Sequence, residues 1–377
     1  MRARDFGIPF AGKCGTYNAI TDVPGVEVGF STIILGESTE DTTKESEFAR
    51  TGVTAILPRG RKRSAVFAGR ADLNGNGELT GTHWIDDSGF MHGPLMITNT
   101  NSVGIVRDTV SKWMVDNDYF FPGYNEGKEV PGLGFFYPTV GETFDGILNN
   151  INGFKVKAEH ALEALNNAAS GPVQEGCVGG GTGMICHGFK GGTGTASRIV
   201  TTSTGEEYTI AALVQANHGL KEDLNIRGIP VGKLIQGCDL EIRQRSPKPG
   251  SGSIIVIIAT DAPFMPWQLS KLARRAALGI GRLGGGNHSG SGDIFLAFST
   301  ANENAFCYTN TTVKMLSDQE MDNFFPMATD AVEESVLNVL VAAEDMYGRN
   351  RNHAYALPHD QLKDILAKYQ NVLDAYR

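Results

Sequence analysis

The chain has 377 residues, and its 33 Lys and Arg residues against 42 Asp and Glu residues give a formal net charge of −9. This acidic balance argues against nucleic acid as a main partner, because neutralising phosphates requires a cationic face. Hydrophobic residues make up 41% of the chain and charged residues 20%, which fits a globular protein and excludes disorder for most of its length. The 47 glycines predict many tight turns or close backbone contacts.

The five cysteines are scattered without a CxxC pair, so neither a disulfide scaffold nor a structural zinc site is expected. The amino terminus lacks the apolar segment of a signal peptide. The longest wholly apolar run, 254–259, is too short to span a membrane. We therefore expect a soluble, cytoplasmic protein with no membrane partner, or a periplasmic one if a leader has been removed.

The first part of the chain is predicted to form a sheet. Short β-rich runs separated by Gly, Pro and Asn occur at 25–30, 52–60, 64–69 and 94–100. Residues 116–141, rich in proline and aromatic residues, are expected to form a long ordered loop.

Helices and further strands are predicted in the middle of the chain. Apolar spacing predicts an amphipathic helix over 154–170. Strand-like runs follow at 199–216 and 228–243, and the polar, proline-containing stretch 244–253 indicates an exposed linker. The next run, 253–263, is apolar on both faces and β-branched, so it is predicted to be a central strand.

The carboxyl-terminal part alternates helix and strand, then becomes helical. A helix is predicted over 266–283 and a strand over 294–300. Ser317 and Glu320 have the spacing of a capping box ahead of a helix that includes 331–346. Apolar residues between 362 and 373 predict a last helix. Without repeats or low-complexity tracts, residues 1–377 are interpreted as a single α/β domain with helices layered on a sheet.

The densest local signal is the glycine-rich segment 177–195. Such a loop could bind phosphate through its backbone N–H groups, so a phosphate- or nucleotide-binding module is one alternative. However, Phe189 stands where a P-loop has lysine, and Met184 where a dinucleotide motif has its third glycine. Close backbone packing beside a site is the preferred interpretation.

Motifs of common hydrolases do not occur. The eight histidines form no HExxH motif, and no serine lies in a GxSxG nucleophile elbow. His187, His218 and His288 each lie in a glycine-rich turn and are interpreted as surface or packing residues rather than ligands. We expect no metal and no organic cofactor.

The junction of Gly252 and Ser253 has the residues that a self-cleaving chain requires. The Ser253 hydroxyl would attack the preceding carbonyl, convert the peptide into an ester, and leave water to release a new amino terminus. The α-amino group formed there, with a pKa of about 8, could then take the proton of the same serine.

The surrounding motifs resemble one family. The sequence is similar, in order and from about Arg4 to about Tyr347, to the DmpA/BapA family of β-aminopeptidases and L-aminopeptidase/D-amidases. The similar segments are ITDVPGV (20–26), GELTGTHWIDDSG (77–89), TNTNSVG (98–104), ETFDGILNNING (142–153), GGGTGM (179–184), LVQANHG (213–219), GSIIVIIATDAP (252–263) and SGSGDIFLAFST (289–300).

The resemblance implies an αββα sandwich, similar to N-terminal-nucleophile hydrolases but differently connected. It implies autocleavage into chains 1–252 and 253–377, with Ser253 as nucleophile and Gly252 as the new carboxyl terminus. It further implies a tetramer of processed protomers that releases one residue from the free amino terminus of a peptide or amide.

The same resemblance implies roles for four other residues. Ser291 and Asp293 match the Ser-Gly-acid triplet beside the nucleophile. Asn217 matches the side-chain oxyanion donor. Glu142 matches the carboxylate that holds the substrate's ammonium.

Some alternatives stay open at this point. Serines are doubled at Ser251 and Ser253 and again at Ser289 and Ser291, so a register two residues earlier remains an alternative. The function of His288 is not assigned. An amidase acting on a non-peptide or lipopeptide acyl amide is the alternative within the same fold, and the sequence does not fix a preference for α- or β-amino residues or their stereochemistry.

Overall fold

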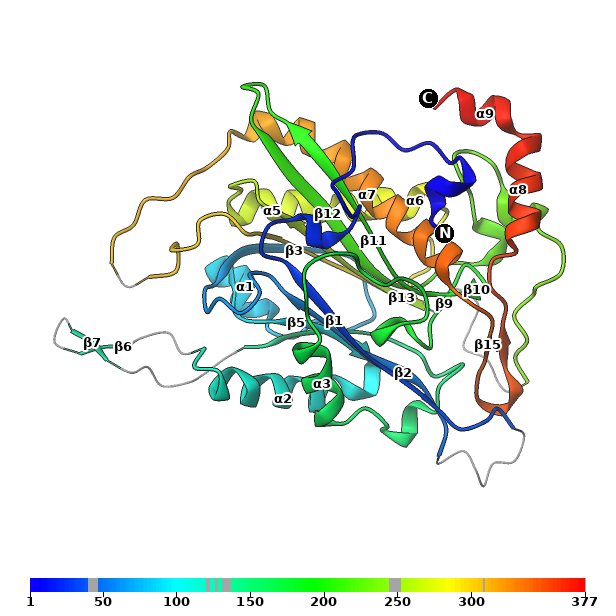
Figure 1. The fold of residues 1–377 in the computed structure, drawn as a ribbon, viewed down its shortest axis with the longest axis horizontal. Coiled ribbons are helices and arrows are strands. Elements are labelled where there is room, and N and C mark those ends of the chain that lie inside the picture. The colour runs from blue at the N-terminus through cyan, green and yellow to red at the C-terminus, as the bar shows by residue number, and fades with distance from the viewer. Residues whose placement is uncertain are drawn as a thin grey trace.

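The computed structural model describes residues 1–39, 47–119, 123–125, 128–130, 137–243, 252–307 and 309–376. Two sheets lie face to face and helices cover the outer face of each, as Figure 1 shows. This order of layers confirms the predicted αββα sandwich. Among the helices described, none combines the length and the apolar character needed to cross a membrane.

The larger sheet carries the strand that begins at the predicted cleavage junction. Its β13–β14 pair is parallel and the others are antiparallel. In spatial order its strands are β11 (Gly192–Thr201), β12 (Glu207–Asn217), β13 (Gly252–Thr260), β14 (Ser291–Ser299), β3 (Val66–Gly75) and β4 (Phe90–Met91).

The smaller sheet has four strands, with β5 and β8 parallel. These strands are β1 (Glu27–Leu35), β2 (Ala49–Leu57), β5 (Leu95–Asn99) and β8 (Thr139–Thr143). Three short hairpins are also present, namely β6 (Gly123–Asn125) with β7 (Lys128–Val130), β9 (Ile185–Cys186) with β10 (Phe189–Lys190), and β15 (Met346–Tyr347) with β16 (His353–Ala354).

Helices pack on both outer faces. The larger sheet is covered by α5 (Pro266–Ala273), α6 (Arg275–Arg282) and α7 (Met321–Ala342), and the smaller by α2 (Val103–Asp116) and α3 (Ala158–Asn166). The remaining helices are α1 (Thr82–Ser88), α4 (Val231–Leu234), α8 (His359–Lys368) and α9 (Gln370–Asp374).

The apolar run of β13 explains its central place. Ile254, Val256 and Ile258 pack against the helices of the larger sheet. The alternate residues Ile255 and Ile257 pack between the two sheets. Successive side chains of a strand point to opposite faces, so only a strand apolar on both faces fits between two buried layers.

Some predicted elements differ from the structure. The strand predicted over 228–243 is wrong: Gly228 adopts a positive φ, Pro230 precedes the short helix α4, and the apolar side chains are buried from turns rather than from a strand. The helices α1 and α2 were not predicted. Only half of the capping box forms, because Ser317 accepts from the Gln319 N–H whereas the Glu320 carboxylate binds Ser203.

Two predicted loops lie partly outside the described residues. Of the loop predicted over 116–141, the described parts are 116–119, 123–125, 128–130 and 137–141, which include the end of α2, the β6–β7 hairpin and the start of β8. Of the predicted linker 244–253, the structure describes only Gly252 and Ser253, which begin β13.

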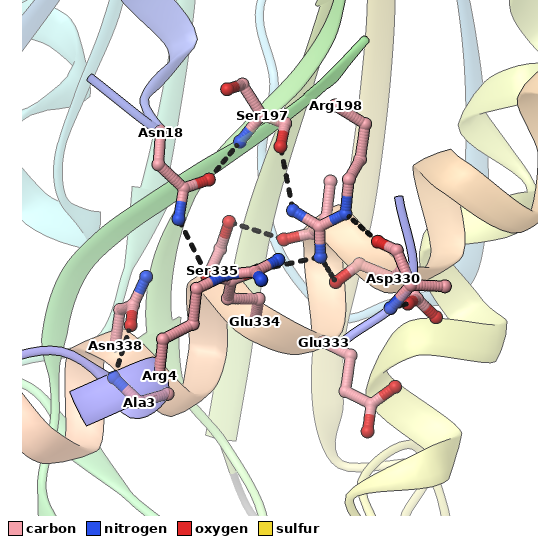
Figure 2. Close-up of polar contacts among 12 residues, drawn as sticks. Ala3, Arg4, Asn18, Ser197, Arg198, Asp330, Glu333, Glu334, Ser335 and Asn338 are labelled. Carbon is pink, nitrogen blue, oxygen red and sulfur yellow. Dashed lines mark hydrogen bonds and ion pairs between the residues drawn. The ribbon is translucent and has the colours of Figure 1, made fainter. Parts of the chain in front are cut away.

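A buried ion-pair cluster fastens the amino-terminal segment to α7, as Figure 2 shows. The Arg198 and Glu334 side chains are both fully buried, and their charged groups lie 2.6 Å apart. Arg4 pairs with the same carboxylate at 2.7 Å, and the Asn18 amide donates to it. Burial favours a higher pKa for Glu334, but Arg198 and Arg4 outweigh it and hold the pKa below its ordinary value.

Removing the shared negative charge should therefore destabilise the fold. We expect Glu334→Gln to lower the free energy of unfolding by about 3–5 kcal/mol, because it leaves the Arg198 cation buried without its carboxylate. The matched control is Asp116→Asn in the exposed pair of Lys112 and Asp116, where a change of at most about 0.5 kcal/mol is expected. Urea unfolding followed by circular dichroism measures both, and an unchanged Glu334→Gln variant would contradict the importance of the cluster.

Candidate active site

Ser253 and Asn217 lie side by side at one end of the larger sheet. Ser253 is the second residue of β13, and the antiparallel register pairs it with Asn217, the last residue of β12. Both side chains are buried, and alternation places them on the face that points toward the smaller sheet, in line with Ile255 and Leu213.

Two N–H groups converge on the Ser253 hydroxyl. The backbone N–H of Phe144, just after β8, donates to Ser253 Oγ at 3.2 Å. The Asn217 side-chain amide donates to the same oxygen at 3.4 Å. Two N–H groups this close to Ser253 Oγ can also reach the carbonyl oxygen of a substrate that the hydroxyl attacks, which is the position of oxyanion donors in acyl transfer.

The Asn217 amide is held in one orientation. Its Oδ1 accepts from the Ile185 backbone N–H at 2.9 Å, and its Nδ2 donates to the Phe144 carbonyl at 2.9 Å. A flipped amide would set its NH₂ against the Ile185 N–H and lose both bonds. The surrounding backbone therefore directs an Asn217 N–H toward Ser253.

Asp145 follows Phe144 and is completely buried behind it. Burial raises the pKa of this carboxyl to about 7, although bonds from Thr51 and Asn149 act in the opposite direction. Its backbone carbonyl accepts from the Leu148 and Asn149 N–H groups. These contacts fix the turn that presents the Phe144 N–H to Ser253.

Ser291 and Asp293 lie on β14, next to the Gly252–Ser253 peptide. The parallel register pairs Ser291 with Gly252. Their side chains alternate with Gly292 and share a face with Phe295, so they lie on the face of the sheet opposite to the Ser253 side chain. The structure thus places these two residues beside the backbone of the junction.

The Ser291–Asp293 pair is tightly hydrogen-bonded. Ser291 Oγ donates to Asp293 Oδ1 at 2.7 Å, and Asn74 Nδ2 donates to Asp293 Oδ2 at 2.7 Å. Burial raises the pKa of Asp293, opposed by those two bonds and by the charge of His288. The carbonyl of His288 accepts from the Ser291 N–H at 3.1 Å, so this residue helps to shape the loop before β14.

Glu142, near the end of β8, is a buried carboxylate in the wall of the same pocket. It accepts from the Glu78 backbone N–H at 3.0 Å and from the Thr100 hydroxyl. Burial raises its pKa, and the bonds from Thr100 and Glu78 act against this effect. Because burial disfavours the negative charge of Glu142, a cationic group bound beside it would stabilise the carboxylate, and an anionic group would not.

One pocket of about 620 Å³ is lined by Ser253, Asn217, Phe144 and Glu142, but not by Ser291 or Asp293. Its wall is mainly apolar, with a small number of polar and charged groups placed around Ser253, as is usual for a small-molecule site. It is lined by Asn76, Gly77, Glu78, Thr100, Glu142, Phe144, Ile147, Ile185, Gly188, Asn217, His218, Gly219, Leu220, Lys221, Leu240, Ile242, Gly252, Ser253 and Gly290.

Three further residues of the site were not predicted, namely Phe144, Asn74 and Thr100. Phe144 contributes a backbone N–H, and a backbone donor leaves no signature in its residue type. Asn74 and Thr100 lie within or next to the family-like segments 77–89 and 98–104, which is the one signal that could have found them.

The glycine-rich segment packs closely, as predicted. A side chain on Gly180 would come within 2.1 Å of the Gln215 side chain, and one on Gly52 within 2.3 Å of the Gly179 carbonyl. The N–H groups of Gly179 and Gly180 donate to threonine hydroxyls of the smaller sheet. Donors already engaged in this way do not form a phosphate cradle, so the structure does not favour the nucleotide-binding alternative.

Comparison with known proteins identifies the family. A family model described as peptidase family S58 matches residues 18–354. The chain belongs to this family.

Curated relatives of family S58 share most of the chain. The β-peptidyl aminopeptidase BapA of Sphingosinicella microcystinivorans is 50% identical over 99% of this chain and 94% of that protein. The β-peptidyl aminopeptidase BapA of Sphingosinicella xenopeptidilytica is 43% identical over 97% of this chain and 90% of that protein.

A solved structure agrees in fold. The L-aminopeptidase D-Ala-esterase/amidase of Ochrobactrum anthropi, a prototype for the serine aminopeptidases, has a TM-score of 0.87 at 47% identity and covers 98% of this chain and 99% of that one. Its fold is a variant of the N-terminal-nucleophile hydrolase fold, and this chain has the same fold. The S58 chain is a serine-type aminopeptidase hydrolase.

Proposed function

We propose that this S58 chain cuts itself between Gly252 and Ser253 and that Ser253, as the new amino-terminal residue, attacks peptide and amide substrates. The observation that carries the proposal is the position of Ser253, the second residue of a central strand, whose side chain lines the pocket and whose hydroxyl accepts two N–H groups. A nucleophile at a strand terminus with preset oxyanion donors is suited to acyl transfer.

Self-cleavage follows from the same hydroxyl. Ser253 Oγ adds to the carbonyl carbon of Gly252, the C–N bond breaks, and the Ser253 nitrogen takes up a proton. Water then hydrolyses the resulting ester, which leaves the Gly252 carboxylate and a free Ser253 amino group. The pairing of Ser291 with Gly252 supports a role for the Ser291–Asp293 pair in moving that proton.

The same atoms then act on substrate. The free α-amino group of Ser253, with a pKa of about 8, removes the proton from Oγ as the hydroxyl attacks the substrate carbonyl. The N–H groups of Asn217 and Phe144 stabilise the oxyanion. The leaving amine takes the proton, and water cleaves the acyl-enzyme ester by the reverse sequence.

The buried Glu142 carboxylate supports selection of substrates with a free amino terminus. It lines the pocket with Ser253, and a substrate ammonium there would satisfy its charge through a charge-assisted bond. The relatives' names support β-amino-acid peptides, or D-alanine amides and esters, as substrates to test first. No specific observation favours an acyl-amide substrate that lacks an amino group.

Neutralising Glu142 should weaken substrate binding more than turnover. We expect Glu142→Gln to raise KM about 10- to 100-fold with a smaller change in kcat, because one charge-assisted bond is lost. In the wild type kcat/KM should fall as pH drops through the raised pKa of Glu142, since a protonated carboxyl no longer attracts the ammonium. The variant should lack this fall and keep only the one caused by protonation of the Ser253 α-amino group. Glu78→Gln, which removes an exposed carboxylate of the same pocket, is the matched control and should change KM little.

Intact mass spectrometry of the purified protein tests the proposal. We expect two polypeptides of 252 and 125 residues, the smaller beginning with Ser253. A smaller chain that begins with Ser251, which lies outside the described residues, would move the nucleophile, and an active single chain would refute the proposal. The resemblance also supports a homotetramer, which light scattering would test.

A further inference from the structure

Three buried side chains of types that can ligate metals, one cysteine and two histidines, meet behind the pocket wall. Cys186 ends β9, His187 lies in the turn of the same hairpin, and His218 follows the last residue of β12. All three residues are buried, with exposed fractions of 2% or less. One ligand atom from each lies within 4.8 Å of the others, and Cys186 Sγ lies 3.9 Å from His218 Nδ1.

The histidines present nitrogen atoms without partners. His187 Nδ1 lies 3.1 Å from the Leu220 carbonyl oxygen, so Nδ1 carries the hydrogen and Nε2 keeps its lone pair. Among the described residues, His187 Nε2 is buried and has no hydrogen-bond partner, and the His218 nitrogen that faces Cys186 Sγ is Nδ1. A backbone carbonyl that fixes one imidazole nitrogen while the other stays unpaired is the usual arrangement of a metal-binding histidine.

Burial opposes a charge on each of the three side chains. Burial lowers the pKa of His187 to about 4 and that of His218 well below its ordinary value. Burial raises the pKa of the Cys186 thiol to about 12, and the charge of Lys190 acts in the opposite direction. The thiol therefore keeps its proton until a cation displaces it.

We propose that Cys186, His187 and His218 bind a thiophilic divalent cation such as Zn²⁺. The Cys186 thiol gives its proton to solvent, and its thiolate joins one nitrogen of each histidine. Tetrahedral coordination brings ligand atoms to about 3.5 Å from one another, so the three side chains need to close by about 1 Å. The pocket supplies an entry path and a water as fourth ligand, because His218 and Gly219 line it.

Occupation of this site should slow catalysis through Asn217. His218 follows Asn217 directly, and Ile185, which precedes Cys186, donates to Asn217 Oδ1. Movement of Cys186 and His218 toward an ion would shift the Ile185 N–H that Asn217 Oδ1 accepts and the backbone of Asn217 itself. It would therefore move the amide that faces Ser253. The proposed cation binding is argued from the geometry of the three side chains alone. The proposed inhibition of catalysis also rests on the function proposed above.

Titration of the metal-free, full-length protein with Co²⁺ tests the binding. We expect one equivalent to give the visible bands of tetrahedral Co²⁺ with a thiolate charge-transfer band, and Zn²⁺ to displace it. Cys186→Ser should lose the thiolate band, and His187→Gln should keep it with affinity at least about tenfold weaker. Cys307→Ser, which changes an exposed cysteine, is the control and should match the wild type.

Activity measurements in the same samples test the inhibition. Zn²⁺ should lower kcat of the wild type and of Cys307→Ser but not that of Cys186→Ser. A wild type without the thiolate band, or a Cys186→Ser variant that keeps it, overturns the site, and Co²⁺ binding without loss of kcat overturns the coupling. If instead Ser253 were not the nucleophile, the Co²⁺ bands would still appear, so the two failures are distinguishable.

Discussion

A Ser253→Ala variant should remain a single chain of 377 residues and lose aminopeptidase activity. Alanine lacks the hydroxyl that adds to the Gly252 carbonyl, so neither the internal ester nor the free amino group of residue 253 forms. Loss of a nucleophilic serine lowers kcat by on the order of 10⁶-fold in other hydrolases, and we expect a loss of that size. Denaturing gel electrophoresis and an assay with a free-amino-terminus amide measure the two effects.

The controls for this prediction are the neighbouring serines. Ser251→Ala and Ser289→Ala keep Ser253 and Ser291, and both should be cut and active. The Ser253→Ala chain should fold, because its strand neighbours Ile254 and Ile255 keep their places on the two faces of β13. Cleavage of the Ser253→Ala chain at the same bond would remove this residue from its proposed role.

The layers of the fold were predictable where the sequence pattern is unambiguous. The β13 strand is apolar on both faces because helices cover one side and the second sheet covers the other. Residues 228–243 carry similar apolar residues. However, Gly228 has a positive φ and Pro230 directly precedes the helix α4, so this segment does not continue as a strand. The burial of apolar residues alone does not distinguish a strand from a turn. Likewise, α2 follows β5 after only a short turn at Thr100–Ser102, and its boundary has no capping side chain to mark it.

The candidate site was predictable in part for a different reason. Ser253, Asn217 and Glu142 carry side-chain chemistry that the family-like motifs preserve, and the structure brings all three to one pocket. It places Ser291 and Asp293 on the opposite face, beside the Gly252 backbone, and no sequence spacing shows which face of a sheet a residue occupies relative to another strand. The contact of the Phe144 N–H with Ser253 joins the two sheets, so it could not be predicted without knowing how the sheets pack.

Removing the Asn217 amide should slow turnover strongly if this amide acts as proposed. We expect Asn217→Ala to lower kcat by about 10²- to 10³-fold, because one N–H that stabilises the oxyanion is lost, with little change in KM. Stopped-time assays on the fully processed fraction measure this effect separately from maturation, which should also slow because the Gly252 carbonyl passes through the same kind of oxyanion. Asn323→Ala, in an exposed asparagine that binds Glu320, is the control and should retain wild-type kcat.

Asn217→Asp separates the donor from the scaffold. An aspartate keeps the oxygen that accepts from the Ile185 N–H but loses the N–H that faces Ser253, and its charge opposes the oxyanion. Its kcat should therefore fall at least as far as that of Asn217→Ala, although the hairpin contact is retained. If the aspartate variant instead kept kcat within about tenfold of the wild type, the Phe144 N–H alone would stabilise the oxyanion, and Asn217 would only hold Ile185 in place.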